Sequence, residues 1–112
     1  MSNSKRKIPQ PVMSAIHSYI ALLQEDHFPI EKVVLFGSYA KGRAHQWSDI
    51  DLCIISPKFR NSWKATRYLW SKRSSDLGLT IEPVGFSPTD YSDTSPLLAE
   101  IKRTGITIPT RQ

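Results

Sequence analysis

Two stretches of the chain decide its fold: VVLFGSYAKGR at residues 33–43 and SDIDLCII at residues 48–55. Each contains an apolar run, rich in β-branched residues, of the length expected for a buried strand. The first run stops at Gly37, and a strand that ends at glycine is typical of a tight turn. Ser38 is then placed to cap a short helix that extends through Ala40 or Lys41. We therefore expect a strand, a turn and a short helix, followed by a second strand.

The second strand presents two carboxylates on one face. Side chains alternate along a strand, so Asp49 and Asp51 point to the same side while Ile50, Leu52 and Ile54 point to the other. Two negative charges side by side on an otherwise apolar strand are unfavourable unless a cation neutralises them. Mg²⁺ is the natural candidate, because it is a hard ion that proteins hold with one or two carboxylates and substrate phosphate oxygens.

The turn before the short helix predicts a phosphate site. Backbone N–H groups at the start of a helix have no partner within the helix and attract anions. Gly37 allows a phosphate to approach closely, and the Ser38 hydroxyl can donate to a phosphate oxygen. Lys41 or Arg43 could add a cationic contact from the adjoining loop. The turn and the carboxylates together predict a site for a metal-bound nucleoside triphosphate.

Glu82 is the best candidate for a third carboxylate. It lies in a third apolar run, residues 79–84, where it shares a face with Thr80 and Val84. Three carboxylates can hold two metal ions that clamp the attacking and leaving oxygens of a transferred phosphoryl group. Glu82 could also take the proton of an attacking hydroxyl.

The remaining segments predict one domain of alternating helices and strands. Apolar residues recur at helical spacing in residues 11–26 and 61–77, with Trp70 in the core or in a helix–helix contact and Gly78 ending the second helix. Residues 87–90 have the composition of a turn, and Pro83 indicates an edge strand or a bulge. The order α-β-α-β-α-β-α is that of a small α/β sandwich.

The carboxyl-terminal segment predicts a last helix and a short strand. Thr94 or Ser95 can cap this helix, and Gly105 ends it. Three apolar residues are expected to face inward from it: Leu97, Leu98 and Ile101. Residues 106–109 can add a short edge strand.

Length, charge and cysteine content narrow the class of protein. The 112 residues suffice for one core, which we assign to residues 11–112 after a basic tail at residues 1–10. The net charge of +5 favours polyanionic partners such as nucleotides or RNA. Cys53 is the only cysteine, which excludes a disulfide framework and predicts a small buried residue. No signal-peptide core or membrane span is evident, so a cytoplasmic protein is expected.

A run of cations between residues 58 and 73 contains no acidic residue and is interleaved with Trp63, Tyr68 and Trp70. A solvated helix face is the favoured interpretation. Binding of a partner protein and binding of nucleic acid by phosphate contacts and stacking remain alternatives.

The sequences LFGSYAKGR at residues 35–43 and SDIDL at residues 48–52 resemble the motifs of the DNA polymerase β-like nucleotidyltransferase superfamily, specifically its small MNT-type domains. The resemblance extends over about residues 12–108. It implies a small mixed sheet packed against helices, with Gly37 and Ser38 on the nucleotide phosphates and Asp49 and Asp51 on two Mg²⁺ ions. The third acid falls on Glu82, where the family more often has aspartate.

The resemblance also implies a reaction and a partner. MNT-type domains often pair, as antitoxins, with a HEPN-domain toxin and transfer AMP from ATP to one of its tyrosines. We therefore expect a Mg²⁺-dependent nucleotidyltransferase, with ATP as the expected substrate, that modifies a hydroxyl of a HEPN-type partner. Two alternatives stay open: a non-catalytic module that masks its partner by contact, and a nucleotidyltransferase that modifies RNA.

Overall fold

The computed structural model describes residues 8–45, 48–73, 79–92 and 95–110. Its elements, in chain order, are α1 (Gln10–Glu25), β1 (Lys32–Phe36), α2 (Ser38–Lys41), β2 (Ile50–Ile55), α3 (Ser62–Ser71), β3 (Ile81–Phe86), α4 (Pro88–Tyr91), α5 (Pro96–Thr104) and β4 (Ile106–Ile108). In the part of the chain that is described, no helix has the length and apolar character needed to cross a membrane.

The strands form one mixed sheet in the order β3-β2-β1-β4. β1 is antiparallel to both β2 and β4, whereas β2 and β3 are parallel. β3 is therefore an edge strand, as Pro83 predicted, and β4 is the opposite edge, as residues 106–109 predicted. The small mixed sheet packed against helices confirms the expected fold class.

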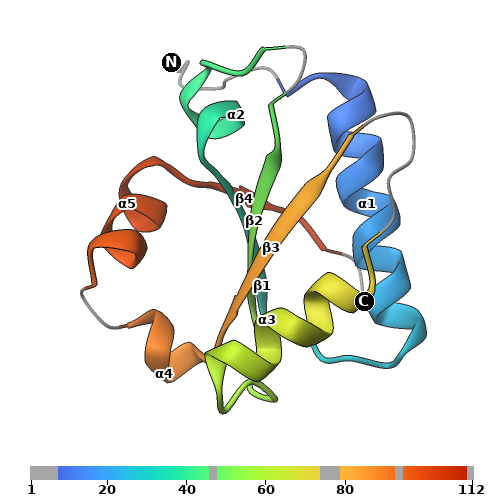
Figure 1. Cartoon of the computed structure of the whole chain (residues 1–112), viewed down its shortest axis with the longest axis vertical. Coiled ribbons are helices and arrows are strands. Elements are labelled where there is room, and N and C mark those ends of the chain that lie inside the picture. The colour runs from blue at the N-terminus through green and yellow to red at the C-terminus, as the bar shows by residue number, and fades with distance from the viewer. Residues whose placement is uncertain (1–7, 46–47, 74–78, 93–94, 111–112) are drawn as a thin grey trace.

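Helices cover both faces of the sheet, but unequally. Figure 1 shows α1 and α3 on one side and α4 and α5 on the other. The first side holds the larger core, in which α1 and α3 pack on alternate strand residues such as Leu35, Leu52 and Ile54. On the second side, Leu98 and Ile101 of α5 cover the remaining alternate residues: Val34, Cys53 and Ile55. Both faces of β2 are consequently apolar except at its first residues, where Asp51 lies.

Gly85 lets α3 lie close against the edge strand. A Cβ atom added there would be 2.8 Å from the Phe59 ring, 2.9 Å from the Ala65 Cβ and 3.0 Å from a Leu69 methyl carbon. Even small overlaps of this kind are unfavourable in a packed core. The missing side chain thus fixes the distance between α3 and β3, and with it the position of the outer face of α3.

Several predictions of local structure were wrong. The helix predicted for residues 61–77 ends at Ser71, and the part of that prediction from residue 74 through Gly78 lies outside the described residues. Residues 87–90 are mostly helical, because the Ser87 hydroxyl accepts from the Asp90 N–H and caps α4. Ser38 is not a cap, since Gly37 occupies that position and no side chain caps α2.

Two apolar side chains predicted to be inside are exposed. Leu97 of α5 is 44% exposed, whereas Leu98 and Ile101 are buried as expected. Trp70 of α3 is 43% exposed. Ser95 caps α5 and Gly105 ends it, as predicted. Cys53 is buried, also as predicted.

Candidate active site

Strand pairing brings the predicted acidic residues together. Asp51 of β2 lies opposite Glu82 of β3 on one side and opposite Phe36 of β1 on the other. Side chains of directly paired residues point to the same face, so these three form a row across the sheet. Asp49 precedes β2 by one residue and shares the face of Asp51. This end of the face lies beyond the residues that α5 buries.

The pKa values of Asp51 and Glu82 are raised, in part by the charges of neighbouring carboxyl groups. Burial raises the pKa of Asp51 from 3.8 to about 6, and the negative charges of Glu82 and Asp49 add to the effect. Burial likewise raises the pKa of Glu82, together with the charge of Asp49 and a hydrogen bond between these two carboxyl groups. Negative charge on these clustered carboxyl groups is therefore unfavourable in the folded protein when no cation lies beside them.

Gly37 leaves the Asp51 carboxylate uncovered. Its φ of 79° and ψ of −152° lie in a region that essentially only glycine adopts. A Cβ atom at this position would overlap the Asp51 Oδ2 atom and lie 3.0 Å from its Cγ. Ser38 follows as the first residue of α2 and is half-buried. The turn and the acid pair predicted from separate stretches of sequence are thus in direct contact.

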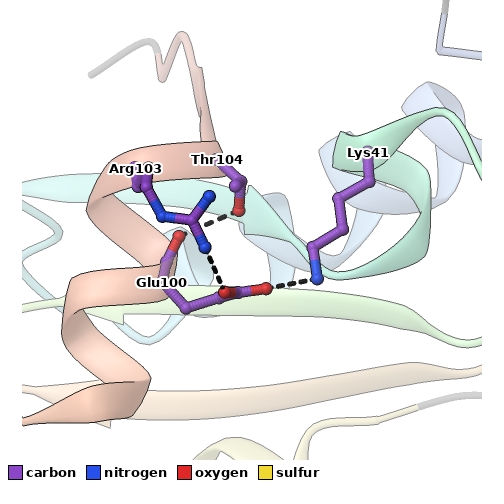
Figure 2. A network of polar contacts seen from close by, with 4 residues as sticks. All are labelled: Lys41, Glu100, Arg103 and Thr104. Carbon is purple, nitrogen blue, oxygen red and sulfur yellow. Dashed lines mark hydrogen bonds and ion pairs between the residues drawn. The ribbon is translucent and has the colours of Figure 1, made fainter.

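The two predicted cationic contacts differ in their surroundings. The Lys41 ammonium forms an ion pair with Glu100 of α5, whose other carboxylate oxygen accepts from Arg103 at 2.8 Å (Figure 2). Glu100 lies on α5, which covers part of the face that carries Asp51. Arg43 is exposed, and none of the described contacts joins its side chain to the carboxylates. Among the described contacts, Lys41 thus pairs with Glu100, and neither cation is joined to Asp49, Asp51 or Glu82.

The carboxyl groups are of the ligand type that Mg²⁺ prefers, but they are not arranged as a preformed metal site. Among the described residues, no three His, Cys, Asp or Glu side chains converge as a preformed metal site. Asp49, Asp51 and Glu82 nevertheless offer hard oxygen donors on one face, which is the ligand type that Mg²⁺ prefers. The repulsion that raises the pKa of Asp51 is also what a bound cation would relieve.

A cavity of about 510 Å³ lies beside Asp51 and Glu82, which we call the acidic row together with Asp49. This cavity was not predicted from the sequence. Asp51 and Glu82 lie on one wall, and Trp63, Arg67 and Trp70 of α3 lie on the other. The spacing of these three residues, at i, i+4 and i+7, places them on one helix face and could have revealed the group. Trp70 was instead assigned to the core or to a helix–helix contact.

Comparison with known proteins now places the chain in a family. The profile of the nucleotidyltransferase domain matches residues 21–92, and the chain belongs to this family. The membership confirms the resemblance noted from the sequence and the expected class of enzyme. A relative from Methanocaldococcus jannaschii, provisionally named a protein adenylyltransferase, is 38% identical over 64 residues. That match covers 54% of this chain and 44% of the relative, so the chain spans less than half of the relative's length.

Solved structures show the same fold. A provisionally named nucleotidyltransferase from Sulfolobus solfataricus has a TM-score of 0.65 at 16% identity, covering 96% of this chain and 87% of its own. A toxin–antitoxin crystallised with AMP-PNP has a TM-score of 0.56 at 23% identity, with 89% and 74% covered. A mutant of the toxin–antitoxin MntA–HpeT has a TM-score of 0.53 at 20% identity, with 85% and 72% covered.

Proposed function

We propose that the protein transfers AMP from ATP to a hydroxyl group of a partner protein in a Mg²⁺-dependent reaction. The observation that carries the proposal is the pairing of Asp51 with Glu82, which gathers the carboxyl groups next to the uncovered turn at Gly37. Asp49, Asp51 and Glu82 would hold two Mg²⁺ ions, and Gly37 and Ser38 would hold the nucleotide phosphates. Bound Mg²⁺ supplies positive charge that neutralises the triphosphate and the developing negative charge.

The reaction itself is a displacement at the α-phosphorus. The acceptor oxygen forms a bond to this phosphorus, and the bond from it to the oxygen that bridges to the β-phosphorus breaks. Pyrophosphate leaves and AMP remains on the acceptor. Glu82 would take the hydroxyl proton; its place on the edge strand, on the side of Asp51 away from Gly37, supports this role. Most of the rate increase in such reactions comes from positioning and charge stabilisation.

The relatives support a protein acceptor and an adenine nucleotide. The Methanocaldococcus jannaschii relative is provisionally named for protein adenylylation, and one similar toxin–antitoxin was crystallised with AMP-PNP. The MntA–HpeT mutant has two aspartates, separated by one residue, replaced by glutamate, and Asp49 and Asp51 have the same spacing. Together with the resemblance to MNT-type domains, these features favour a HEPN-domain partner and an antitoxin role.

Label transfer tests the proposal. The protein is incubated with ATP labelled at the α-phosphate, Mg²⁺ and the protein encoded by the neighbouring gene. We expect label on that protein and its loss in chelator. Asp49→Asn or Asp51→Asn should lower the rate by about a hundredfold or more, since a lost metal ligand removes several kcal/mol of charge stabilisation. Asp90→Asn makes the same chemical change on α4, beyond the far end of β3, and should leave the rate within about twofold.

The outcomes separate the alternatives. A stable complex that forms without label transfer would favour the non-catalytic module. Label on added RNA rather than on protein, with an affinity for RNA that falls steeply with salt, would favour the RNA-modifying enzyme. Equal activity of the Asp51→Asn and Asp90→Asn variants would overturn the assignment of the site.

A further inference from the structure

One face of α3 closes the cavity beside the carboxyl groups. Trp63, Arg67 and Trp70 lie along this face, opposite Asp51 and Glu82. Because β3 is an edge strand, α3 can present these side chains beyond the sheet without a further strand in the way. We call the group formed by Trp63, Arg67 and Trp70 the α3 rim.

The two tryptophans of the α3 rim are exposed, and one is held in place. Trp63 is 69% exposed, more than any other large apolar side chain in the described residues. The Trp70 indole N–H donates to the Pro83 carbonyl oxygen at 3.0 Å, and the Arg73 guanidinium lies 3.8 Å above its ring. Among the described contacts, no hydrogen bond or ring contact of this kind holds Trp63. Exposed tryptophans next to a cavity are typical of a binding surface.

Charge adds a second feature to this surface. Within the described part of the chain, no carboxylate lies within ion-pair distance of four cations near α3: Lys58, Arg60, Lys64 and Arg67. Arg67 is the only one of them that lines the cavity, whereas the other three line a separate hollow beside Phe28 and Tyr68. The cavity thus combines aromatic walls with a single arginine.

We propose that the α3 rim binds the segment of the partner protein that carries the acceptor hydroxyl, with an aromatic residue in the cavity and an acidic residue against Arg67. The proposal rests on the proposed function, which places the phosphates at Gly37. An in-line displacement requires the acceptor oxygen and the departing pyrophosphate to lie on opposite sides of the α-phosphorus. Gly37 adjoins β1, so the acceptor must approach from the side of Glu82, where the cavity opens.

The same features disfavour a nucleic acid as the occupant. A nucleic-acid strand would carry several phosphates past the carboxyl groups, and each phosphate contact relies on a cation. Among the described residues, Arg67 lines the cavity and Arg73 lies over the Trp70 ring, so two cations rather than a long series are present there. A protein segment needs only one acidic side chain there, and tryptophan and arginine are the residues that most often dominate protein–protein binding.

The experiment compares two pairs of variants. Trp63→Ala and Arg67→Glu change the α3 rim. Leu97→Ala and Arg60→Glu are matched controls, because Leu97 is an exposed apolar residue on α5 and Arg60 undergoes the same charge reversal outside the cavity. The probes are two fluorescein-labelled peptides with a central tyrosine, flanked by glutamates in one and by lysines in the other. Anisotropy gives their affinities in Mg²⁺ and AMP-PNP, and label transfer is followed to the glutamate peptide and to the neighbouring gene product.

We expect wild type to bind the glutamate peptide about tenfold more tightly than the lysine peptide. Trp63→Ala should weaken binding of the glutamate peptide about tenfold, and Arg67→Glu should weaken it and strengthen binding of the lysine peptide. The controls should stay within about twofold. Equal affinities of wild type and the α3 rim variants, or equal losses in Arg60→Glu and Arg67→Glu, would overturn the proposal.

Label transfer separates failure of this proposal from failure of the proposed function. Normal transfer to the partner that is insensitive to Trp63→Ala would overturn the docking surface and leave the function intact. Peptide binding that depends on Trp63, without transfer to any acceptor, would overturn the function and leave the surface. A Trp63-dependent affinity for a labelled RNA oligonucleotide that exceeds the affinity for either peptide would overturn a protein occupant.

Discussion

Asp51 carries a carboxylate that metal binding would need in its charged form, although burial in the fold disfavours that charge. Its carboxyl group is half-buried between Asp49 and Glu82, and burial is the main reason why its pKa rises from 3.8 to about 6. The folded protein therefore binds this proton more tightly than the unfolded chain does. Between about pH 4 and pH 6 the unfolded chain loses the proton first, so rising pH lowers the free energy of unfolding, and the loss is complete above pH 6.

Replacing Asp51 by asparagine should remove this loss. In metal-free buffer with chelator, Asp51→Asn should raise the free energy of unfolding at pH 7.5 by about 1 kcal/mol, with little difference from wild type at pH 4. The raised pKa would correspond to about 3 kcal/mol for a fully buried group, but solvent screening of a half-exposed carboxylate reduces it. Urea unfolding at several pH values measures the difference. A gain that is the same at pH 4 and pH 7.5 would show that the carboxylate charge is not its cause.

The residues of the site differ in how far the sequence could predict them. The turn at Gly37 and the pair Asp49 and Asp51 follow from local rules, namely a strand that stops at glycine and the alternation of side chains. The contact of Asp51 with Glu82 depends on the register between β2 and β3, which are separated by α3. Local sequence does not specify such a register. The position of Trp70 was predicted wrongly because helical spacing shows only that a helix face is apolar. It does not show that this part of α3 lies over the edge strand β3, where no further strand covers the side chain.

The ion pair between α2 and α5 is the feature at the scale of elements that bears on the proposed phosphate site. Lys41 lies in the last turn of α2, and its ion pair with Glu100 joins α2 to α5 (Figure 2). The hydrogen bond from Lys41 is the main reason why the pKa of Glu100 is lowered, so this carboxylate is charged and competes with any phosphate for Lys41. The Lys41 ammonium thus has two possible roles: it holds α2 against α5 through Glu100, or it leaves Glu100 to contact a phosphate when the nucleotide binds.

Two substitutions distinguish these roles. If Lys41 contacts the triphosphate, Lys41→Met should lower the affinity for Mg²⁺-ATP about tenfold, the size expected for one charge-assisted contact. Glu100→Gln should leave the affinity within about twofold or raise it, because it frees the ammonium. Titration with a fluorescent ATP analogue measures both. Equal losses in the two variants would mean that Lys41 acts only by holding α2 against α5.

The bounds of helices and strands were predicted well where local sequence specifies them and poorly where contacts between distant segments decide them. α1, β1, β2 and α5 were predicted nearly as they are, since each has a clear apolar period and an end signal such as Ser95 or Gly105. α4 was read as a turn because a helix of four residues shows no period. The tie from Trp70 to the Pro83 backbone, which places α3 against the sheet edge, has no counterpart in local sequence.

For the whole molecule, the site depends on elements that are distant in the chain. The carboxyl groups lie on β2 and β3, the turn at Gly37 lies against Asp51, and α3 lines the cavity beside Glu82. α5 covers one end of this sheet face and leaves the other end to the carboxyl groups. A ligand that binds this end contacts parts of the chain that separate completely on unfolding. Its binding should therefore stabilise the entire fold, not only one loop.

Thermal unfolding measures this coupling. With Mg²⁺-ATP at a hundred times its dissociation constant, mass action adds about 2.7 kcal/mol, which for a domain of this size raises the Tm by roughly 10 °C. Chelator should abolish the shift, because ATP without a cation adds negative charge to an acidic surface. Asp49→Asn should show little shift at the same concentrations, whereas Trp63→Ala should show the full shift if the α3 rim binds the acceptor and not the nucleotide. A shift that survives in chelator would indicate that ATP binds elsewhere, at the basic surface near α3, and not at the carboxyl groups.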